Sequence, residues 1–181
     1  MWVTPKGRAI HRLAVVVCAH SQGEVILDSR ALRNCLGRFA TGVSILTTVD
    51  PERGPVGMTV NSFAAVSLEP PLVLWSIQNT SECYRAFTEC ERYGISVLGS
   101  DQSDLSSRYA RSHEHHIDDG DCLLNDLGVP LVNGAIATFS CRTEAIHAGG
   151  DHKIIVGEVE AFSELGGQPL VFFGGAYQEL A

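Results

Sequence analysis

The chain has 181 residues, of which 45% are hydrophobic and 19% are charged, a composition that can bury one good core and excludes a disordered chain. Its 21 acidic and 13 basic side chains give a formal net charge of −8, which repels a phosphate backbone and argues against nucleic-acid binding. No uninterrupted apolar stretch approaches the roughly 20 residues that span a bilayer, so we expect one soluble domain without a membrane segment.

The six cysteines form no CxxC pair and lie within apolar, periodic segments, a pattern typical of buried free thiols rather than of a disulfide framework or a metal site. They are Cys18, Cys35, Cys83, Cys90, Cys122 and Cys141. This usage favours a reducing, cytoplasmic location.

We expect residues 1–27 to be an N-terminal extension, loosely ordered or forming an extra edge strand, and residues 28–181 to be the domain. Asp28 or Ser29 can cap a first helix, with Gly42 as its stop signal. The apolar residues of that helix recur at helical spacing: Leu32, Cys35, Leu36 and Phe39.

The rest of the chain is dominated by β patterns. Helices are expected after a cap at Thr80 or Ser81 and from Asp101 through Arg108. Strands are expected at 43–49, 56–60, 72–77, 94–99, 137–145, 153–162 and 169–175. Many short strands with few helices between them favour an antiparallel β-barrel over a doubly wound parallel sheet.

Several familiar chemical signatures are missing. The chain contains no GxxxxGK[ST] or GxGxxG phosphate loop and no GxSxG nucleophile elbow, so a Rossmann unit and a serine hydrolase are not indicated. The polar segment 111–121 carries His113, Glu114, His115, His116, Asp118 and Asp119. Neighbouring side chains on an irregular loop do not converge on one ion without a rigid frame, so we interpret this segment as a solvated surface loop rather than a metal site.

Two short segments have the composition of a cofactor site. Small polar side chains interrupt an otherwise apolar strand–turn–strand at Thr59, Asn61, Ser62 and Ser67. An ordinary polar turn has this composition too, but such donors between apolar walls also suit the pyrimidine edge and phosphate of a flavin. A capped helix start at Asn79, Thr80 and Ser81 offers either an anion site or simple helix capping.

A family resemblance emerges from an ordered set of short motifs. These are LGRFATGVSILTT, GPVGMTVNSFAAVSLEPPLVLWSI, NTSECYRAF, SSRYA, GGDHKIIVGEVEAF and PLVFFGGAY. From about Leu32 to Leu180 the chain resembles the flavin reductase-like family, the short-chain reductase components of two-component flavin-dependent monooxygenases. Each motif alone is weak, but their order and spacing match along nearly the whole domain.

The resemblance implies a mainly β (α+β) fold, the FMN-binding split β-barrel, which is an antiparallel Greek-key barrel with a few flanking helices. It implies a homodimer with flavin sites near the interface, reduction of FMN or FAD by NADH or NADPH, and a transient monooxygenase partner that receives the reduced flavin. Two features depart from the family: the extension before Asp28 and the histidine-rich residues 113–116.

The resemblance also assigns roles. Flavin contacts are implied for Thr59, Val60, Asn61, Ser62, Phe63, Ala65 and Val66, and phosphate contacts for Asn79, Thr80, Ser81 and Arg108. The nicotinamide side is implied for Gly149, Gly150, Asp151, His152 and Tyr177. Of these, His152 is expected to position the nicotinamide without acid–base work, because the two cofactors carry the hydride transfer themselves. A structural histidine at the start of a strand is the competing interpretation.

Two alternatives remain open. A flavin- or haem-binding split barrel without reductase turnover would need no nicotinamide pocket, so residues 149–152 discriminate against it. An oxidase or oxygenase that uses flavin and oxygen directly is less favoured, because no additional polar substrate pocket is visible in the sequence.

Overall fold

The computed structural model describes residues 19–21, 24–26 and 28–180. The first elements are the short hairpin of β1 (Ala19–Ser21) and β2 (Glu24–Ile26), which pair antiparallel. The remainder of the predicted extension 1–27 lies outside the described residues, and whether the domain begins at residue 28 stays a prediction.

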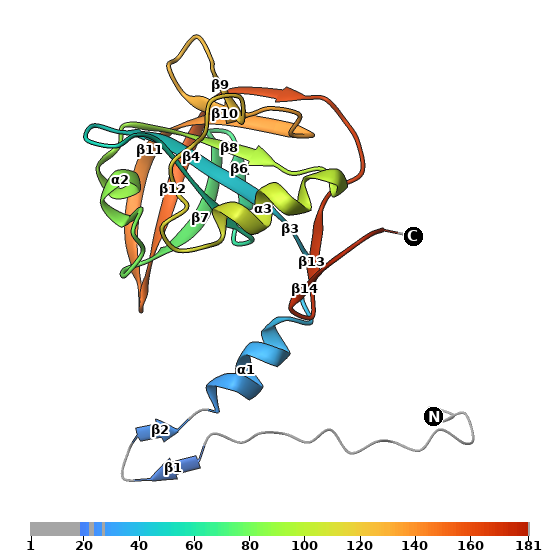
Figure 1. Cartoon of the computed structure of the whole chain (residues 1–181). Helices are drawn as coiled ribbons and strands as arrows, with labels where there is room; N and C mark the ends of the chain where they lie inside the picture. The colour runs from blue at the N-terminus through green and yellow to red at the C-terminus, as the bar shows by residue number, and fades with distance from the viewer. Residues whose placement is uncertain (1–18, 22–23, 27, 181) are drawn as a thin grey trace, which may run out of the picture.

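The main body is a curled antiparallel sheet of seven strands (Figure 1). Its spatial order is β5-β4-β8-β11-β12-β7-β6, so the chain leaves β5 for the opposite edge of the sheet and returns beside β4. The strands are β4 (Ser44–Asp50), β5 (Gly54–Val60), β6 (Ala64–Leu68), β7 (Pro71–Gln78), β8 (Arg92–Val97), β11 (Ala137–Gly149) and β12 (His152–Glu164). The predicted antiparallel barrel with a few flanking helices is confirmed.

Shorter elements cover the ends and one side of the sheet. The helical elements are α2 (Tyr84–Glu89), a 3₁₀ turn η1 (Ser100–Gln102) and α3 (Ser103–Tyr109). β9 (Cys122–Leu124) pairs with β10 (Pro130–Val132), and a three-stranded sheet has the order β14 (Ala176–Gln178), β13 (Val171–Phe173), β3 (Thr41–Gly42).

The alternation of side chains along β4 builds two cores. Leu46 points into the barrel, where it belongs to a cluster with Trp75 and Ile155. Its neighbour Ile45 points to the other face, where it packs in a second cluster with Tyr109. Successive residues of a strand face opposite sides, so one strand with apolar residues at both parities needs cover on both faces, and α3 and β10 contribute that cover.

The first helix, α1 (Ser29–Leu36), projects from the barrel (Figure 1). Asp28 is its N-cap as predicted, because Oδ1 accepts hydrogen bonds from the backbone N–H groups of Arg30 at 2.9 Å and Ala31 at 3.1 Å. The predicted stop at Gly42 was wrong: the helix ends at Gly37, and Gly42 pairs with Val171 in the three-stranded sheet. No side chain of α1 is buried, and the apolar residues that predicted the helix therefore lie on an uncovered face.

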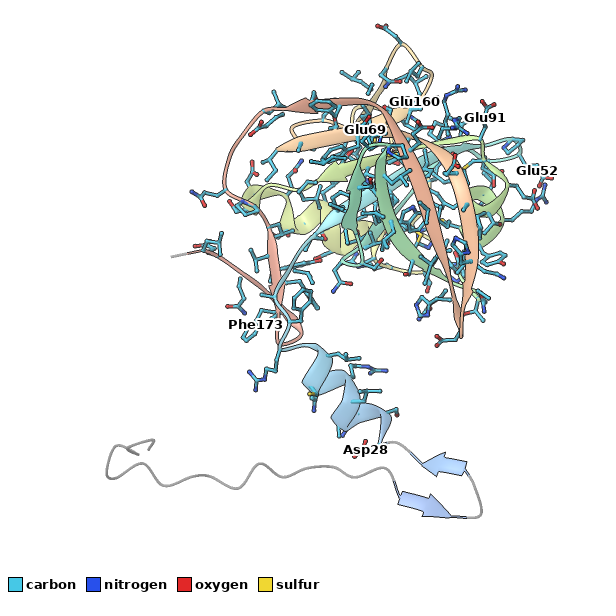
Figure 2. All side chains as sticks on the ribbon, turned by 180° about the vertical axis from the view of Figure 1, so that it is seen from behind. Asp28, Glu52, Glu69, Glu91, Glu160 and Phe173 are labelled. Atoms are coloured by element: carbon cyan, nitrogen blue, oxygen red, sulfur yellow. The ribbon has the colours of Figure 1, made fainter. Side chains whose placement is uncertain are left out.

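The barrel end of α1 is tied to the C-terminal strands. The Gly174 N–H donates to the Gly37 carbonyl at 2.8 Å, and the Arg38 guanidinium lies 5.8 Å from the centre of the Phe173 ring (Figure 2). A cation over an aromatic face and one backbone hydrogen bond fix where the helix leaves the barrel.

Inside the barrel, Gly157 on β12 leaves room for Tyr93 on β8. A Cβ added at Gly157 would collide with the Tyr93 hydroxyl and come within 2.9 Å of Cζ. Because Tyr93 is fully buried against Trp75, with ring centres 5.8 Å apart, its ring has no free space to move into.

Gly157→Ala is therefore expected to lower the free energy of unfolding by about 1–3 kcal/mol through overpacking. Chemical denaturation monitored by tryptophan fluorescence measures the change. Gly42→Ala is the matched control, because a Cβ there meets nothing within 4 Å. Equal unfolding midpoints for the two variants would contradict the packing argument.

Candidate functional site

A cavity of about 540 Å³ opens where the end of β5 faces the end of β7 and the start of β12. Its lining residues are Met58, Thr59, Val60, Asn61, Ser62, Ser76, Gln78, Thr80, Ser81, Glu82, Ala110, Ser112, His115 and His152. Seven of the sequence-predicted site residues are thereby brought together: Thr59, Val60, Asn61, Ser62, Thr80, Ser81 and His152.

The wall at residues 59–62 is shaped by side-chain hydroxyls that bond to the backbone. Ser62 Oγ accepts the Ser76 N–H at 3.0 Å and lies 3.3 Å from the Ser76 carbonyl oxygen, to which it can donate. Thr59 Oγ1 donates to the Ser106 carbonyl at 2.7 Å. These bonds hold the chain where it leaves β5, while the Asn61 side chain remains exposed on the cavity side.

The turn at 79–83 forms a second wall, and it differs from the prediction. Helix α2 begins only at Tyr84 with Cys83 as its N-cap, so the expected helix start at Thr80 or Ser81 was wrong. Ser81 Oγ instead accepts the Cys83 N–H at 3.2 Å within the turn. Thr80 and Ser81 still line the cavity, but as turn residues with hydroxyl groups rather than as the N-terminus of a helix.

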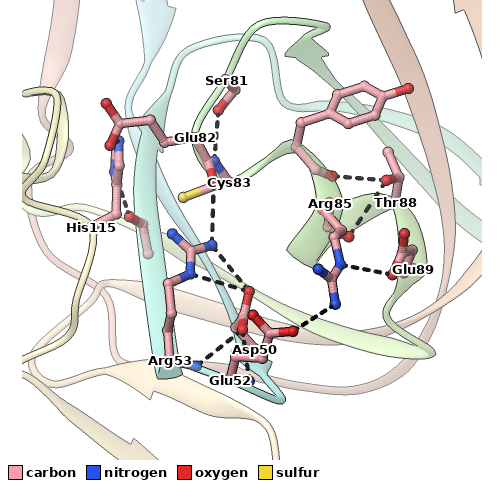
Figure 3. A network of polar contacts seen from close by, with 12 residues as sticks. Asp50, Glu52, Arg53, Ser81, Glu82, Cys83, Arg85, Thr88, Glu89 and His115 are labelled. Carbon is pink, nitrogen blue, oxygen red and sulfur yellow. Dashed lines mark hydrogen bonds and ion pairs between the residues drawn. The ribbon is translucent and has the colours of Figure 1, made fainter.

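An ion pair between a buried Asp50 and a partly exposed Arg53 anchors this turn (Figure 3). The Arg53 guanidinium pairs with Asp50 Oδ2 at 3.0 Å and donates to the Glu82 carbonyl at 3.2 Å. Asp50 Oδ1 accepts the N–H groups of Glu52 at 2.9 Å and Arg53 at 3.0 Å. The β4–β5 turn thus holds the backbone beside the cavity.

The hairpin between β11 and β12 supplies the third wall. Gly150 adopts a φ of +74°, which suits a two-residue turn, and Gly149 pairs with His152 across it. Asn79 fixes the hairpin to the neighbouring turn, with its N–H 2.9 Å from the Asp151 carbonyl oxygen and Nδ2 3.2 Å from the Gly150 carbonyl oxygen. Asn79 therefore positions the hairpin rather than lining the cavity.

His152 is the residue of this hairpin that reaches the cavity. Its Nδ1 lies 2.7 Å from Asp151 Oδ1, and this hydrogen bond lowers the pKa of Asp151 below its usual value. The contact orients the imidazole, because a carboxylate partner fixes which ring nitrogen carries the hydrogen.

Tyr177 lies on the other side of the β5 end. It lines a neighbouring cavity of about 180 Å³ that shares Thr59, Val60 and Asn61 with the first. Its hydroxyl is 2.8 Å from Ser106 Oγ, and its ring packs edge-on against Phe172 with centres 5.8 Å apart. The predicted Tyr177 thus adjoins the site without lining the larger cavity.

Four other predicted contacts lie away from both cavities. Phe63 packs against Phe139 with ring centres 5.7 Å apart, and Ala65 and Val66 are exposed on β6. The Arg108 guanidinium is surrounded by carboxylates, with Asp118 at 2.7 Å, Asp121 at 3.1 Å and Glu114 at 3.8 Å. Its charge is thus already neutralised inside the protein.

Sequence reasoning missed seven lining residues: Met58, Ser76, Gln78, Glu82, Ala110, Ser112 and His115. Gln78 and Ser76 continue the strand before the predicted turn, and the alternation of β7 could have revealed them. His115 belongs to the segment interpreted as solvated surface, and only its fold onto β5 brings it to the cavity. Within the described residues, no group of three or more His, Cys, Asp or Glu side chains is arranged to hold a metal ion.

Comparison with known proteins identifies the family. A model described as "Flavin reductase like domain" matches residues 36–181. The chain belongs to this family. It is 51% identical over 150 residues to FMN reductase (NADH) SmoA of Agrobacterium fabrum, covering 83% of this chain and 85% of that one. It is 37% identical over 154 residues to the reductase subunit HsaB of a flavin-dependent monooxygenase of Mycobacterium tuberculosis, covering 83% and 82%.

Solved structures agree with this membership. The NADH:FAD oxidoreductase SgcE6 of Streptomyces globisporus, determined in complex with NAD and FAD fragments, superposes with a TM-score of 0.80 at 33% identity, covering 85% of this chain and 93% of that one. The flavin reductase PheA2 superposes with a TM-score of 0.78 at 35% identity, covering 86% and 99%. The fold is therefore the split β-barrel that the resemblance implied. No helix among the described residues is long and apolar enough to cross a membrane.

The Asp50 anchor makes a prediction about pH. Hydrogen bonds from the Glu52 N–H and from Arg53 lower the pKa of Asp50, against the opposing effect of burial. A carboxyl with a lowered folded-state pKa stabilises the fold above its unfolded-state pKa, and that stability is lost as the pH falls through the folded value.

Asp50→Asn is expected to lower the melting temperature most near neutral pH, with the difference from the wild type shrinking below about pH 4. Differential scanning calorimetry from pH 3 to 8 measures it. Glu89→Gln is the control, because its pair with Arg85 is exposed and worth about 0–1 kcal/mol. A pH-independent Asp50→Asn difference would mean that the ion pair does not stabilise this turn.

Proposed function

We propose that the protein transfers hydride from NADH to FMN or FAD in the 540 Å³ cavity. The observation that carries the proposal is the convergence of residues 59–62, the turn at 80–82 and His152 on one hollow in a chain of the flavin reductase-like family. The volume falls within the roughly 300–1,000 Å³ of small-molecule sites, and the hydroxyl and amide groups on its walls suit the polar edge and phosphate of a flavin.

A flavin bound in the cavity would supply the redox chemistry, with the hydride coming from the nicotinamide and the proton from solvent. The protein's own residues orient the rings: Ser62 and Thr59 fix the wall, and Asn79 with Asp151 fixes the hairpin that carries His152. Holding two reactants in contact and excluding water from one face is the catalytic contribution, and it requires no acid, base or nucleophile from the chain.

NADH is the proposed donor rather than NADPH. Two of the relatives above, FMN reductase (NADH) SmoA and the NADH:FAD oxidoreductase SgcE6, are named for NADH. None of the residues that line the described cavity is Lys or Arg, the side chains that would pair with the additional phosphate of NADPH. The proposed partner is a flavin-dependent monooxygenase that receives the reduced flavin, by analogy with the relative from Mycobacterium tuberculosis.

We also propose that the protein is a homodimer. The edge strand β6 exposes Val66 by 50% and Leu68 by 94%, and apolar residues on an unpaired sheet edge favour contact with a second copy.

The proposed location is the cytoplasm. The five cysteines among the described residues are free thiols, as expected in a reducing compartment.

Turnover is tested by mixing the purified protein with NADH or NADPH and FMN or FAD and following nicotinamide absorbance. Oxidation faster than the uncatalysed rate is expected, with NADH preferred. No acceleration with any of the four pairs would refute the reductase and leave the alternative of a cofactor-binding barrel without turnover.

His152→Ala is expected to raise the KM for NADH by about tenfold while changing the KM for flavin less. His152 reaches the cavity from the hairpin between β11 and β12, whose residues 149–152 are the proposed nicotinamide contacts. Steady-state kinetics with each substrate varied in turn measures the split. Lys153→Ala, one residue along β12 and outside the cavity lining, is the control. Equal effects of His152→Ala on both KM values would make the assignment wrong.

Leu68→Asp is expected to convert the dimer to a monomer in analytical ultracentrifugation, since a charge on the contact edge is costly to bury. Leu123→Asp, at an exposed leucine on β9, is the matched control and should leave the dimer intact. A wild type that sediments as a monomer at micromolar concentration would refute the dimer, and a dimer that survives Leu68→Asp would refute this edge as its interface.

A further inference from the structure

The segment between α3 and β9 brings into the cavity a histidine that the sequence analysis assigned to a solvated surface loop. His115 lines the cavity, and its side chain is only 13% exposed. The segment was expected to be solvated surface, so the burial of one of its polar rings beside a cofactor-sized hollow requires an explanation.

The backbone around His115 is fixed to β5, at one edge of the sheet. The Gly57 N–H donates to the His115 carbonyl at 2.8 Å, and the Ile117 N–H donates to the Pro55 carbonyl at 3.1 Å. Val56 and His116 form an antiparallel bridge between these bonds. The segment therefore runs as a short extra strand along β5, which places His115 rigidly rather than on a free loop.

The ring of His115 is fixed as well. Its Nδ1 lies 3.1 Å from the Gly57 carbonyl oxygen. A carbonyl oxygen only accepts hydrogen bonds, so Nδ1 carries the hydrogen and Nε2 is the nitrogen left for other partners. Nε2 faces Glu82, with 3.9 Å between it and Oε2 (Figure 3).

Glu82 holds the segment at a second point. Its Oε2 accepts the His113 N–H at 3.0 Å, and its Oε1 lies 3.2 Å from His113 Nδ1. The backbone of Glu82 is itself anchored by Arg53 at 3.2 Å. Glu82 therefore lies against the rings of both His113 and His115.

A cation in the cavity would strengthen its hold on a phosphate. Arg108, which the resemblance assigned to this task, is engaged by Asp118 and Asp121 and does not line the cavity. Among the lining residues only His115 and His152 can become cationic, and His152 is already paired with Asp151. The hydroxyls of Thr80, Ser81 and Ser112 share the lining with His115.

We propose that the His115 imidazolium is the cationic contact for a cofactor phosphate in this cavity, with Nε2–H donating to the phosphate and Glu82 acting as the residue that positions the ring. The proposal rests on the proposed function, because it requires a phosphate-bearing flavin or dinucleotide in the site. Charge-assisted hydrogen bonds of this kind are roughly twice as strong as neutral ones.

The proposal implies that phosphate binding depends on the charge of the His115 ring, so the charged groups that face the ring bear on it. The charged or titratable groups around the ring are Glu82 from the turn before α2, His113 and Glu114 from its own segment, and His152 from β12 across the cavity. Glu114 points toward Arg108 and Arg111 and is neutralised there. β5 presents the Gly57 carbonyl oxygen to the ring.

The test compares ligands with and without phosphate on His115→Gln, His115→Ala and wild type. Dissociation constants for FMN and riboflavin are measured by flavin fluorescence from pH 5.5 to 8.5, and KM values for NADH and for dihydronicotinamide riboside are measured alongside. His115→Ala is expected to weaken the phosphate-bearing ligand by about tenfold and its phosphate-free counterpart by less than about twofold. The pair of ligands that shows this split identifies whether the phosphate is that of the flavin or of the nicotinamide donor.

Three comparisons separate a phosphate contact from a structural role. His115→Gln keeps a neutral hydrogen-bond donor at this position. Its binding of the phosphate-bearing ligand is expected to vary with pH as that of His115→Ala does, and not as that of the wild type does. Glu82→Gln removes the carboxylate that faces Nε2 and is expected to weaken the phosphate-bearing ligand more than its phosphate-free counterpart, because the ring loses the group that positions it. His116→Gln, which changes an exposed histidine of the same segment outside the cavity lining, is the control and should leave both constants within about twofold.

Equal weakening of phosphate-bearing and phosphate-free ligands, or no weakening in His115→Ala, would overturn the proposal. These outcomes differ from failure of the proposed function, in which the wild type itself does not oxidise NADH with any flavin. A wild type that turns over while His115→Ala binds every ligand normally refutes the His115 contact alone.

Discussion

The strand β4 is the constraint on which both the barrel and the cavity depend. It is hydrogen-bonded to β5 on one side and β8 on the other, and its residues 44–48 are all buried. Leu46 packs in the inner core and Ile45 in the outer one. A shift of one residue in the register of β4 would therefore turn each of these side chains to the opposite face. β5 inherits this register, and residues 59–62, where the chain leaves β5, therefore stand at a fixed place opposite β7.

Period-two patterns were the part of the fold that the sequence revealed best. The alternation at 137–145 predicted β11, and the β-branched run at 43–49 predicted β4 within about a residue at each end. Signals that rest on one residue were weaker. Gly42 by itself predicts a helix stop and Ser81 a helix cap. Gly42 instead pairs in a sheet and Ser81 bonds within a turn, because long-range pairing and the Arg53 anchor outweigh the local preference.

The residues of the candidate site also differ in how well the sequence predicts them. Residues 59–62 and His152 could be found because they lie in motifs that resemble a known family, and the structure brings them to one cavity. Glu82 and His115 could not be found, because 33 positions separate them along the chain and only the docking of 115–117 on β5 joins them. Arg108 was predicted from its residue type, because a guanidinium suits phosphate, yet it does not line the cavity. Asp118 and Asp121 form ion pairs with it instead.

The carboxylates around Arg108 and the histidine beside Glu82 belong to one arrangement. Arg108 and Arg111 engage Glu114 from α3 and its C-terminal end, while Glu82 engages His113 from the opposite side, so the segment that carries His115 is held at both flanks. A segment held in this way loses little conformational entropy when a ligand binds. The same set of ion pairs thus holds Arg108 outside the cavity and holds the segment that brings His115 into the cavity. An imidazole binds phosphate through a charge that depends on pH, whereas a guanidinium stays charged throughout.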